Sequence, residues 1–374
     1  MGLLSAIWLR GGTDASVWSM MESWSAGIQG WFVDHNSDIP TAPEATLRVK
    51  TSAVAPELGN HQYASRYSPL DHGRDDKVAC GRPRTKPRSD VNSSLVYQWT
   101  DETGQTHMSD KRPQGRVASV MDIGPTKRDF TYKILTDGIS LPAGFDGKLN
   151  AGSKRIYDTW HFFLGDAKLR QSRIRLLLMG PPARFDAYRE RISPGRKPVN
   201  GFYRMSNNQA VVKFDKNNLD RVLGTTFHEV SHLITASHLG PTPPWLTEGL
   251  AEYFENMQVQ WQGGLISPNT AHIKLLKNTA IPRLDTFLSM DRSEWYGNDR
   301  SRNYAIAWSL MHFLMGGAPG MYAIQEVVSM AEENFCKPFS HVDALDQAYP
   351  GGIRRLEADW RKWLAVGEYR AQQV

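Results

Sequence analysis

A short motif in a helix-forming stretch constrains the fold of this chain more than any other feature. Residues 225–232 read Thr-Thr-Phe-His-Glu-Val-Ser-His, which places His228 and His232 one helical turn apart on one face. Residues 219–237 repeat apolar side chains at helical spacing and contain few helix breakers, so we expect a helix here. Two imidazoles in this arrangement can bind one zinc ion, and Glu229 beside them can act as a general base. The alternative is a pair of helix histidines that are exposed or hydrogen-bonded and bind no metal.

The residues that follow supply a third candidate ligand. Residues 243–255 read Pro-Pro-Trp-Leu-Thr-Glu-Gly-Leu-Ala-Glu-Tyr-Phe-Glu, which predicts a second helix behind two prolines. Glu248 follows His232 by sixteen residues, enough for the chain to turn and return. A carboxylate there completes three protein ligands and leaves a fourth position for water. Glu252, one turn further, can accept a hydrogen bond from the free nitrogen of a ligand histidine, with His228 the first choice. The alternative for Glu252 is an exposed helix acid.

Together these segments resemble the glutamate-zincin metallopeptidases. The pattern His228-Glu229-x-x-His232, followed by Trp245-Leu246-x-Glu248-Gly249-Leu250-Ala251, is similar to the bacterial peptidase MA-like families and more distantly to aminopeptidase N. The resemblance implies a zincin-like fold over residues 128–320, one Zn²⁺ ion on His228, His232 and Glu248, and Glu229 as catalytic base. The chain departs from aminopeptidase N in a shorter spacing to the third ligand and in lacking its motif for the substrate amino terminus.

The same resemblance suggests a further catalytic residue and a cleft border. Tyr304 lies 56 residues past Glu248, where the aminopeptidase relatives carry a tyrosine that stabilises the oxyanion; a core tyrosine is the alternative, and Tyr296 is a weaker competitor. The resemblance also implies that the strand at residues 210–214 borders the cleft, where a substrate could add to its edge. His238 and His312 are expected to be structural.

The pattern of the last two thirds of the chain predicts an α+β fold. Strands are expected at residues 130–135, 174–179, 201–205 and 210–214, and helices at 147–164 and 181–191. After residue 219 the pattern is helical, broken by Gly and Pro. We therefore expect a small sheet followed by the motif helix and a mostly helical C-terminal half, in one zinc metallopeptidase domain at residues 127–374.

A β-hairpin module is expected at residues 94–126. A β-rich run at residues 95–100 meets a turn at 101–104, and Pro113 ends a second short strand. Tyr97, Trp99, Asp101 and Gly104 form the pattern Tyr-x-Trp-x-Asp-x-x-Gly, which resembles a short proteobacterial domain of unknown function. Proteins with that module are usually exported, so the resemblance implies the periplasm or cell envelope, with the cytoplasm as the alternative.

The first 93 residues differ in composition and pattern from the rest of the chain. Residues 1–33 include a Trp-rich apolar stripe that predicts an amphipathic or anchor helix, which would pack on protein or associate with a membrane. No positive charge precedes its first apolar run, so it does not read as a signal peptide. Residues 34–93 are rich in Pro, Ser, Asp and Arg and are expected to be a largely disordered linker.

The net charge bears on the kind of partner, and the cysteine content bears on disulfide formation. The formal net charge is only +5, and no aromatic-basic module is present, so we expect no nucleic-acid partner. The two cysteines, Cys80 and Cys336, are far apart in sequence and are expected to be unpaired thiols, with a pair in an oxidising compartment as the alternative.

These patterns point to a zinc peptidase acting on a peptide or protein substrate. Two other readings stay open: a catalytically silent zinc-binding scaffold of the cell envelope, and a zinc hydrolase of another amide or ester. The sequence does not determine the oligomeric state.

Overall fold

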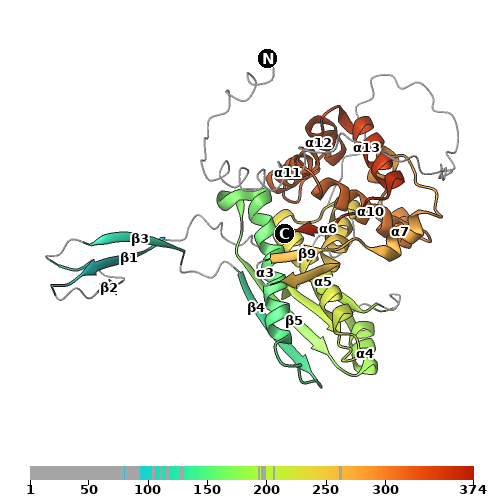
Figure 1. The fold of residues 1–374 in the computed structure, drawn as a ribbon. Helices are drawn as coiled ribbons and strands as arrows, with labels where there is room; N and C mark the ends of the chain where they lie inside the picture. The colour runs from blue at the N-terminus through green and yellow to red at the C-terminus, as the bar shows by residue number, and fades with distance from the viewer. Residues whose placement is uncertain are drawn as a thin grey trace, which may run out of the picture. The chain divides into compact units, whose positions relative to one another are not determined.

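The fold is seen in a computed structural model, drawn in Figure 1. It describes Cys80 and residues 93–102, 106–109, 112–114, 118–125, 130–192, 194, 199–204, 207–260 and 263–374. The helix expected at residues 1–33 lies outside the described residues, as does the linker expected at 34–93 except for its residues Cys80 and Ser93. No helix in the described part of the chain is long and apolar enough to cross a membrane.

The hairpin region forms a three-stranded antiparallel sheet. Strands β1 (Ser93–Thr100) and β2 (Thr106–Ser109) make the predicted hairpin, with Trp99 paired to His107. A strand that the sequence did not indicate, β3 (Ser119–Pro125), pairs with the other edge of β1. His107 stacks on Trp99 and lies 2.6 Å from Asp101, so residues of the Tyr-x-Trp-x-Asp pattern hold the turn together.

From residue 130 onwards the chain first forms a four-stranded mixed sheet. It contains β4 (Phe130–Asp137), β5 (Ser172–Met179), β6 (Gly201–Arg204) and β7 (Gln209–Lys213) in the order β4-β5-β7-β6. Strands β4, β5 and β7 are parallel to one another, and the edge strand β6 runs antiparallel to β7. The sheet leads into a mostly helical second half, as expected for the α+β class.

Alternation along the strands places helices on both faces of this sheet. Ile174, Leu176 and Leu178 of β5 face the main core, which includes α3 (Phe145–Lys168) and α5 (Leu219–Leu239). Met179 and Val211 face the opposite side, where they pack with Phe185 of α4 (Pro182–Ile192). The labels in Figure 1 show α3 and α4 flanking the strands.

The C-terminal half consists of helices that enclose α6 (Pro244–Glu255). A small antiparallel sheet of β8 (Met257–Gln260), β9 (Gly263–Ile266) and β10 (Gln372–Gln373) joins the end of the chain to this region. The remaining helices are α7 (Thr270–Leu276), α8 (Leu284–Leu288), α9 (Arg292–Trp295), α10 (Arg300–Met315), α11 (Ala318–Glu333), α12 (His341–Ala348) and α13 (Gly352–Val366). Helix α10 packs against both α6 and α7.

The prediction of two unpaired thiols is wrong. Cys80 and Cys336 form a disulfide, with their Cα atoms 5.6 Å apart, across a sequence separation of 256 residues. Their separation carried no pairing signal, because only tertiary folding brings positions so distant along the chain together. The bond attaches Cys80 to the segment between α11 and α12.

Candidate metal centre

Helix α5 carries the two histidines of the motif. The Asn218 side chain accepts a hydrogen bond from the backbone N–H of Arg221 at its start, and Gly240, with φ 71°, ends it. Val230 and Leu233 are buried in the main core, so the rotation of the helix is set by packing. His228 and His232 then project from the same face, as the four-residue spacing predicts.

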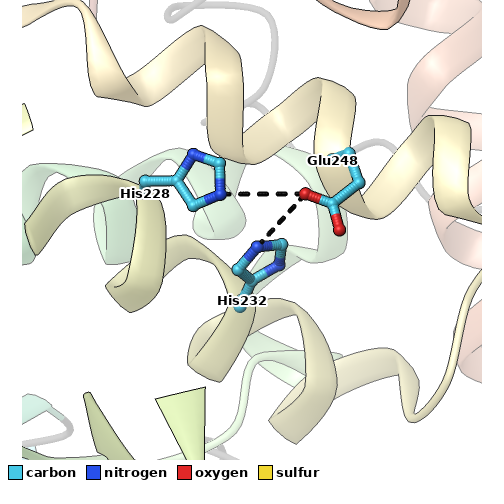
Figure 2. A group of neighbouring side chains, drawn as sticks. All are labelled: His228, His232 and Glu248. Atoms are coloured by element: carbon cyan, nitrogen blue, oxygen red, sulfur yellow. Dashed lines mark ion pairs between the residues drawn. The ribbon is translucent and has the colours of Figure 1, made fainter. Parts of the chain in front are cut away.

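Helix α6 brings Glu248 to the two histidines. The helix begins at Pro244, and its buried Trp245, Leu246 and Leu250 pack it into the main core. Glu248 Oε2 lies 3.7 Å from His228 Nε2 and 3.4 Å from His232 Nε2. Figure 2 marks both pairs with dashed lines. The structure therefore brings together the three residues predicted as ligands, with a nitrogen, a nitrogen and an oxygen all within 4.8 Å of one another.

This arrangement fits a small tetrahedral cation. Zinc bonds of about 2.0–2.1 Å place neighbouring ligand atoms of a tetrahedron about 3.3–3.4 Å apart, close to the two distances above. Oε2 of Glu248 is buried and has no hydrogen-bond partner among the described residues, and a cation is the partner it needs. The donor set, two imidazoles and one carboxylate, is one that zinc accepts with a fourth position open.

The acidic side chains around the two histidines also favour a cation at this position. Glu229, Glu248, Glu252 and Glu255 all act on this cluster, and their described ion pairs involve histidines rather than Lys or Arg. Burial would raise the pKa of Glu248, but the two histidines and the Tyr296 hydroxyl lower it to about 2. Glu248 is thus an anion at neutral pH, as a metal ligand of this type would be.

A second layer of contacts holds His228, and it differs from the sequence prediction. Glu252 was expected to accept a hydrogen bond from His228, but its Oε1 is 3.8 Å from Nδ1, which is too long. Glu255 Oε2 lies 3.0 Å from the same nitrogen, and the other oxygen of Glu252 lies 2.7 Å from Nε2 of His272. Glu255 is seven residues past Glu248 and so on the same helical face, a spacing that could have identified it.

Glu229 is placed against the edge strand. Its side chain is buried, and burial raises the pKa of its carboxyl group above the usual range. A Cβ on Gly201 would lie 3.0 Å from Oε1 of Glu229 and 2.7 Å from Cγ2 of Thr225. The absence of a side chain at Gly201 therefore makes room for the carboxylate of Glu229, a role that the sequence analysis missed.

Two tyrosines approach the carboxylates in different ways. The Tyr296 hydroxyl donates a hydrogen bond to Oε1 of Glu248 at 2.6 Å, so it orients a ligand. Tyr304, at the start of α10, is close enough for Glu248, Glu252 and Glu229 to add to the effect of burial in raising its pKa. Its hydroxyl stays protonated, and within the described residues no hydrogen bond occupies it. Of these two tyrosines, Tyr304 is the one whose hydroxyl makes no hydrogen bond within the described residues.

The sequence analysis also made predictions about the strand that borders the site and about two other histidines. The strand bordering the site is not residues 210–214: β7 lies between β5 and β6, and β6 is the edge. From β6, Tyr203 packs its ring 4.6 Å from that of His232. His238 and His312 are structural, as predicted, since each is buried and lies within hydrogen-bond distance of a backbone carbonyl oxygen.

Two family models, both without an assigned activity, match parts of the chain. The family described as Protein of unknown function (DUF1570) matches residues 223–330, a segment that contains His228, Glu229, His232, Glu248 and Tyr304. The family described as Domain of unknown function (DUF4124) matches residues 90–128, where the hairpin module was predicted. No curated protein matches the chain.

Proposed function

We propose that this chain is a zinc-dependent peptidase of the glutamate-zincin type. The observation that carries the proposal is the convergence of His228 Nε2, His232 Nε2 and Glu248 Oε2, with the buried Glu229 on the same helix face. A zinc ion on these three atoms would polarise a substrate carbonyl and lower the pKa of a water in the fourth position to about 7.

The protein's own residues would manage the protons. Glu229 is buried, and burial raises the pKa of its carboxyl group although the two histidines lower it, so it can take a proton and release it again. In peptide hydrolysis it would accept a proton from the attacking water and pass it to the departing amine. The backbone at Gly201 lies close to the carboxylate of Glu229 and would limit its movement during both transfers.

Tyr304 would stabilise the charge that develops on the substrate oxygen. Its hydroxyl remains protonated because burial and three carboxylates raise its pKa. A neutral donor aimed at a developing oxyanion stabilises the transition state more than the ground state. Tyr296, already bonded to Glu248, would act through that ligand instead.

The proposed location is the periplasm or cell envelope. A disulfide between Cys80 and Cys336 is compatible with an oxidising compartment, and the hairpin module supports the same location.

The test compares the wild type with Glu229→Gln, using Glu326→Gln on the exposed face of α11 as the control. Bound metal is measured by mass spectrometry, and hydrolysis is followed with a library of quenched fluorescent peptides. We expect one zinc per chain in all three proteins and hydrolysis only in the wild type and the control.

The alternatives give different results. Zinc without hydrolysis of any peptide in the wild type would favour a silent scaffold. Zinc with hydrolysis of simple esters or non-peptide amides alone would indicate a different hydrolase. A well-folded protein that binds no zinc would overturn the proposal.

A further inference from the structure

A cavity lies beside the candidate centre, at the carboxyl-terminal edge of the parallel strands. Its volume is about 700 Å³, a size that suits a small ligand or a substrate side chain. Its lining includes the residues that directly follow β4 and β5, namely Gly138–Ser140 and Gly180–Pro182, and those at the end of β7, Lys213–Lys216. Open sheets with parallel strands commonly bind ligands at this edge.

The cavity adjoins the catalytic glutamate through two residues. Thr225 lines the cavity and lies one helical turn before Glu229 on α5. A Cβ on Gly201 would touch both side chains, and Asn200 immediately before it also lines the cavity. Thr225 is one helical turn, about 5.4 Å, from Glu229, and an extended residue spans about 3.3–3.6 Å, so a substrate group that enters the cavity past Thr225 would lie about two residues from the cleaved bond.

The charge of the lining is positive. Lys213, Lys216 and Arg221 line the cavity against a single acid, Asp215, which is paired with Arg221. Lys213 reaches Asp186 at 3.2 Å, whereas Lys216 makes no ion pair within the described residues. Lys216 is therefore the one lining cation that has no acidic partner within the described residues.

The backbone adds to this positive character. Each parallel strand runs into a helix at this edge, so α4 and α5 both begin beside the cavity, near Pro182 and Leu219. The start of a helix carries a partial positive charge from its unpaired N–H groups. Apolar contacts from Ile139, Phe214 and Val222 complete a site suited to a short aliphatic stem that ends in an anion.

We propose that this cavity is a specificity pocket that binds a carboxylate of the substrate within two residues of the cleaved bond, with Lys216 as its main charged partner. This inference deepens the proposed peptidase function and rests on it. The carboxylate can come from a Glu or Asp side chain or from the carboxyl terminus of a peptide, since both present the same anion.

The test uses matched peptides that carry Glu or Gln at each of the two positions on either side of the cleaved bond. For the wild type we expect kcat/KM to be about fivefold or more higher with Glu at one of these positions. Lys216→Glu should abolish or reverse that preference. Lys362→Glu, an exposed change on α13, should retain it. Free-acid and amidated peptides distinguish a side-chain carboxylate from a terminal one.

A binding measurement separates this inference from the proposed function. Fluorescence anisotropy of the Glu and Gln peptides on Glu229→Gln, with and without Lys216→Glu, reports on the pocket without hydrolysis. Tighter binding of the Glu peptide that depends on Lys216 supports the pocket even if no peptide is ever cleaved. If the wild type and Lys216→Glu both bind and cleave the Glu and Gln peptides equally well, the proposed pocket is wrong. Cleavage of both peptides would still support the peptidase function.

Discussion

Oε2 of Glu255 lies 3.0 Å from Nδ1 of His228, whereas Oε1 of Glu252 lies 3.8 Å from the same atom. Glu255 therefore holds the ring that presents Nε2 to the candidate metal position, and it sets which nitrogen carries the proton. Glu252 is occupied by His272 and supports the site from further away.

We expect Glu255→Gln to weaken zinc binding by about tenfold or more, because a neutral amide orients and polarises the imidazole less well. Competition with a zinc chelator of known affinity measures the effect. Glu252→Gln is the matched comparison and should lower the affinity less. An unchanged affinity in Glu255→Gln would show that its contact with His228 has no role in metal binding.

The two tyrosines should separate metal binding from catalysis. In the proposed mechanism Tyr304→Phe removes the hydroxyl that stabilises the oxyanion, so kcat should fall by about a hundredfold with zinc affinity unchanged. Tyr296→Phe removes the hydrogen bond to Glu248, so zinc affinity should fall. Chelator titration and steady-state kinetics on both variants provide the readout, and a loss of kcat confined to Tyr296→Phe would reverse the assignment.

Gly201 should tolerate no side chain. A methyl group there would come within 3.0 Å of Glu229 and 2.7 Å of Thr225, so Gly201→Ala must displace the base. We expect kcat to fall by at least about tenfold with zinc retained, since small misplacements of a catalytic group are costly. Gly147→Ala on α3 meets no atom within 4 Å and serves as the control. Full activity of Gly201→Ala would mean that β6 does not position Glu229.

The disulfide should contribute to stability. Cross-linking Cys80 to Cys336 restricts the unfolded chain, so replacing both by Ser should lower the free energy of unfolding by about 2–4 kcal/mol. Denaturant unfolding with and without a reducing agent measures this difference. The double Ser variant should not respond to the reductant, and two titratable thiols in unreduced wild type would contradict the pairing.

His341 should make the protein less stable in mild acid. Burial lowers its pKa from 6.5 to about 3, and its Nδ1 accepts a hydrogen bond from Trp245 Nε1. The unfolded state therefore binds more protons than the folded state between those values, and stability is lost as the pH falls from about 6.5 towards 3. The slope approaches about 1.4 kcal/mol per pH unit for one such group.

Unfolding midpoints between pH 7 and pH 5 check this expectation. His341→Asn keeps an acceptor for Trp245 but cannot be protonated, so its stability should depend less steeply on pH. Some slope should remain, because burial also lowers the pKa of His312. Parallel curves for the variant and the wild type would contradict the assignment.

Local spacing determined much of what the sequence revealed. The helical repeat placed His228 and His232 on one face, and two prolines followed by apolar residues predicted the helix that carries Glu248. A β-rich run followed by turn residues likewise predicted the hairpin, and local apolar runs predicted the individual strands of the larger sheet, because both signals depend on residues only a few positions apart.

Only the tertiary structure decided the contacts between distant segments. It selected Glu255 over Glu252 for His228, put β6 rather than β7 at the edge, and joined Cys80 to Cys336. It also gathered the ends of three strands and the starts of two helices into a cationic cavity beside Glu229. Each of these depends on how helices and strands pack and turn relative to one another, and packing over long separations leaves no periodic signal along a single chain.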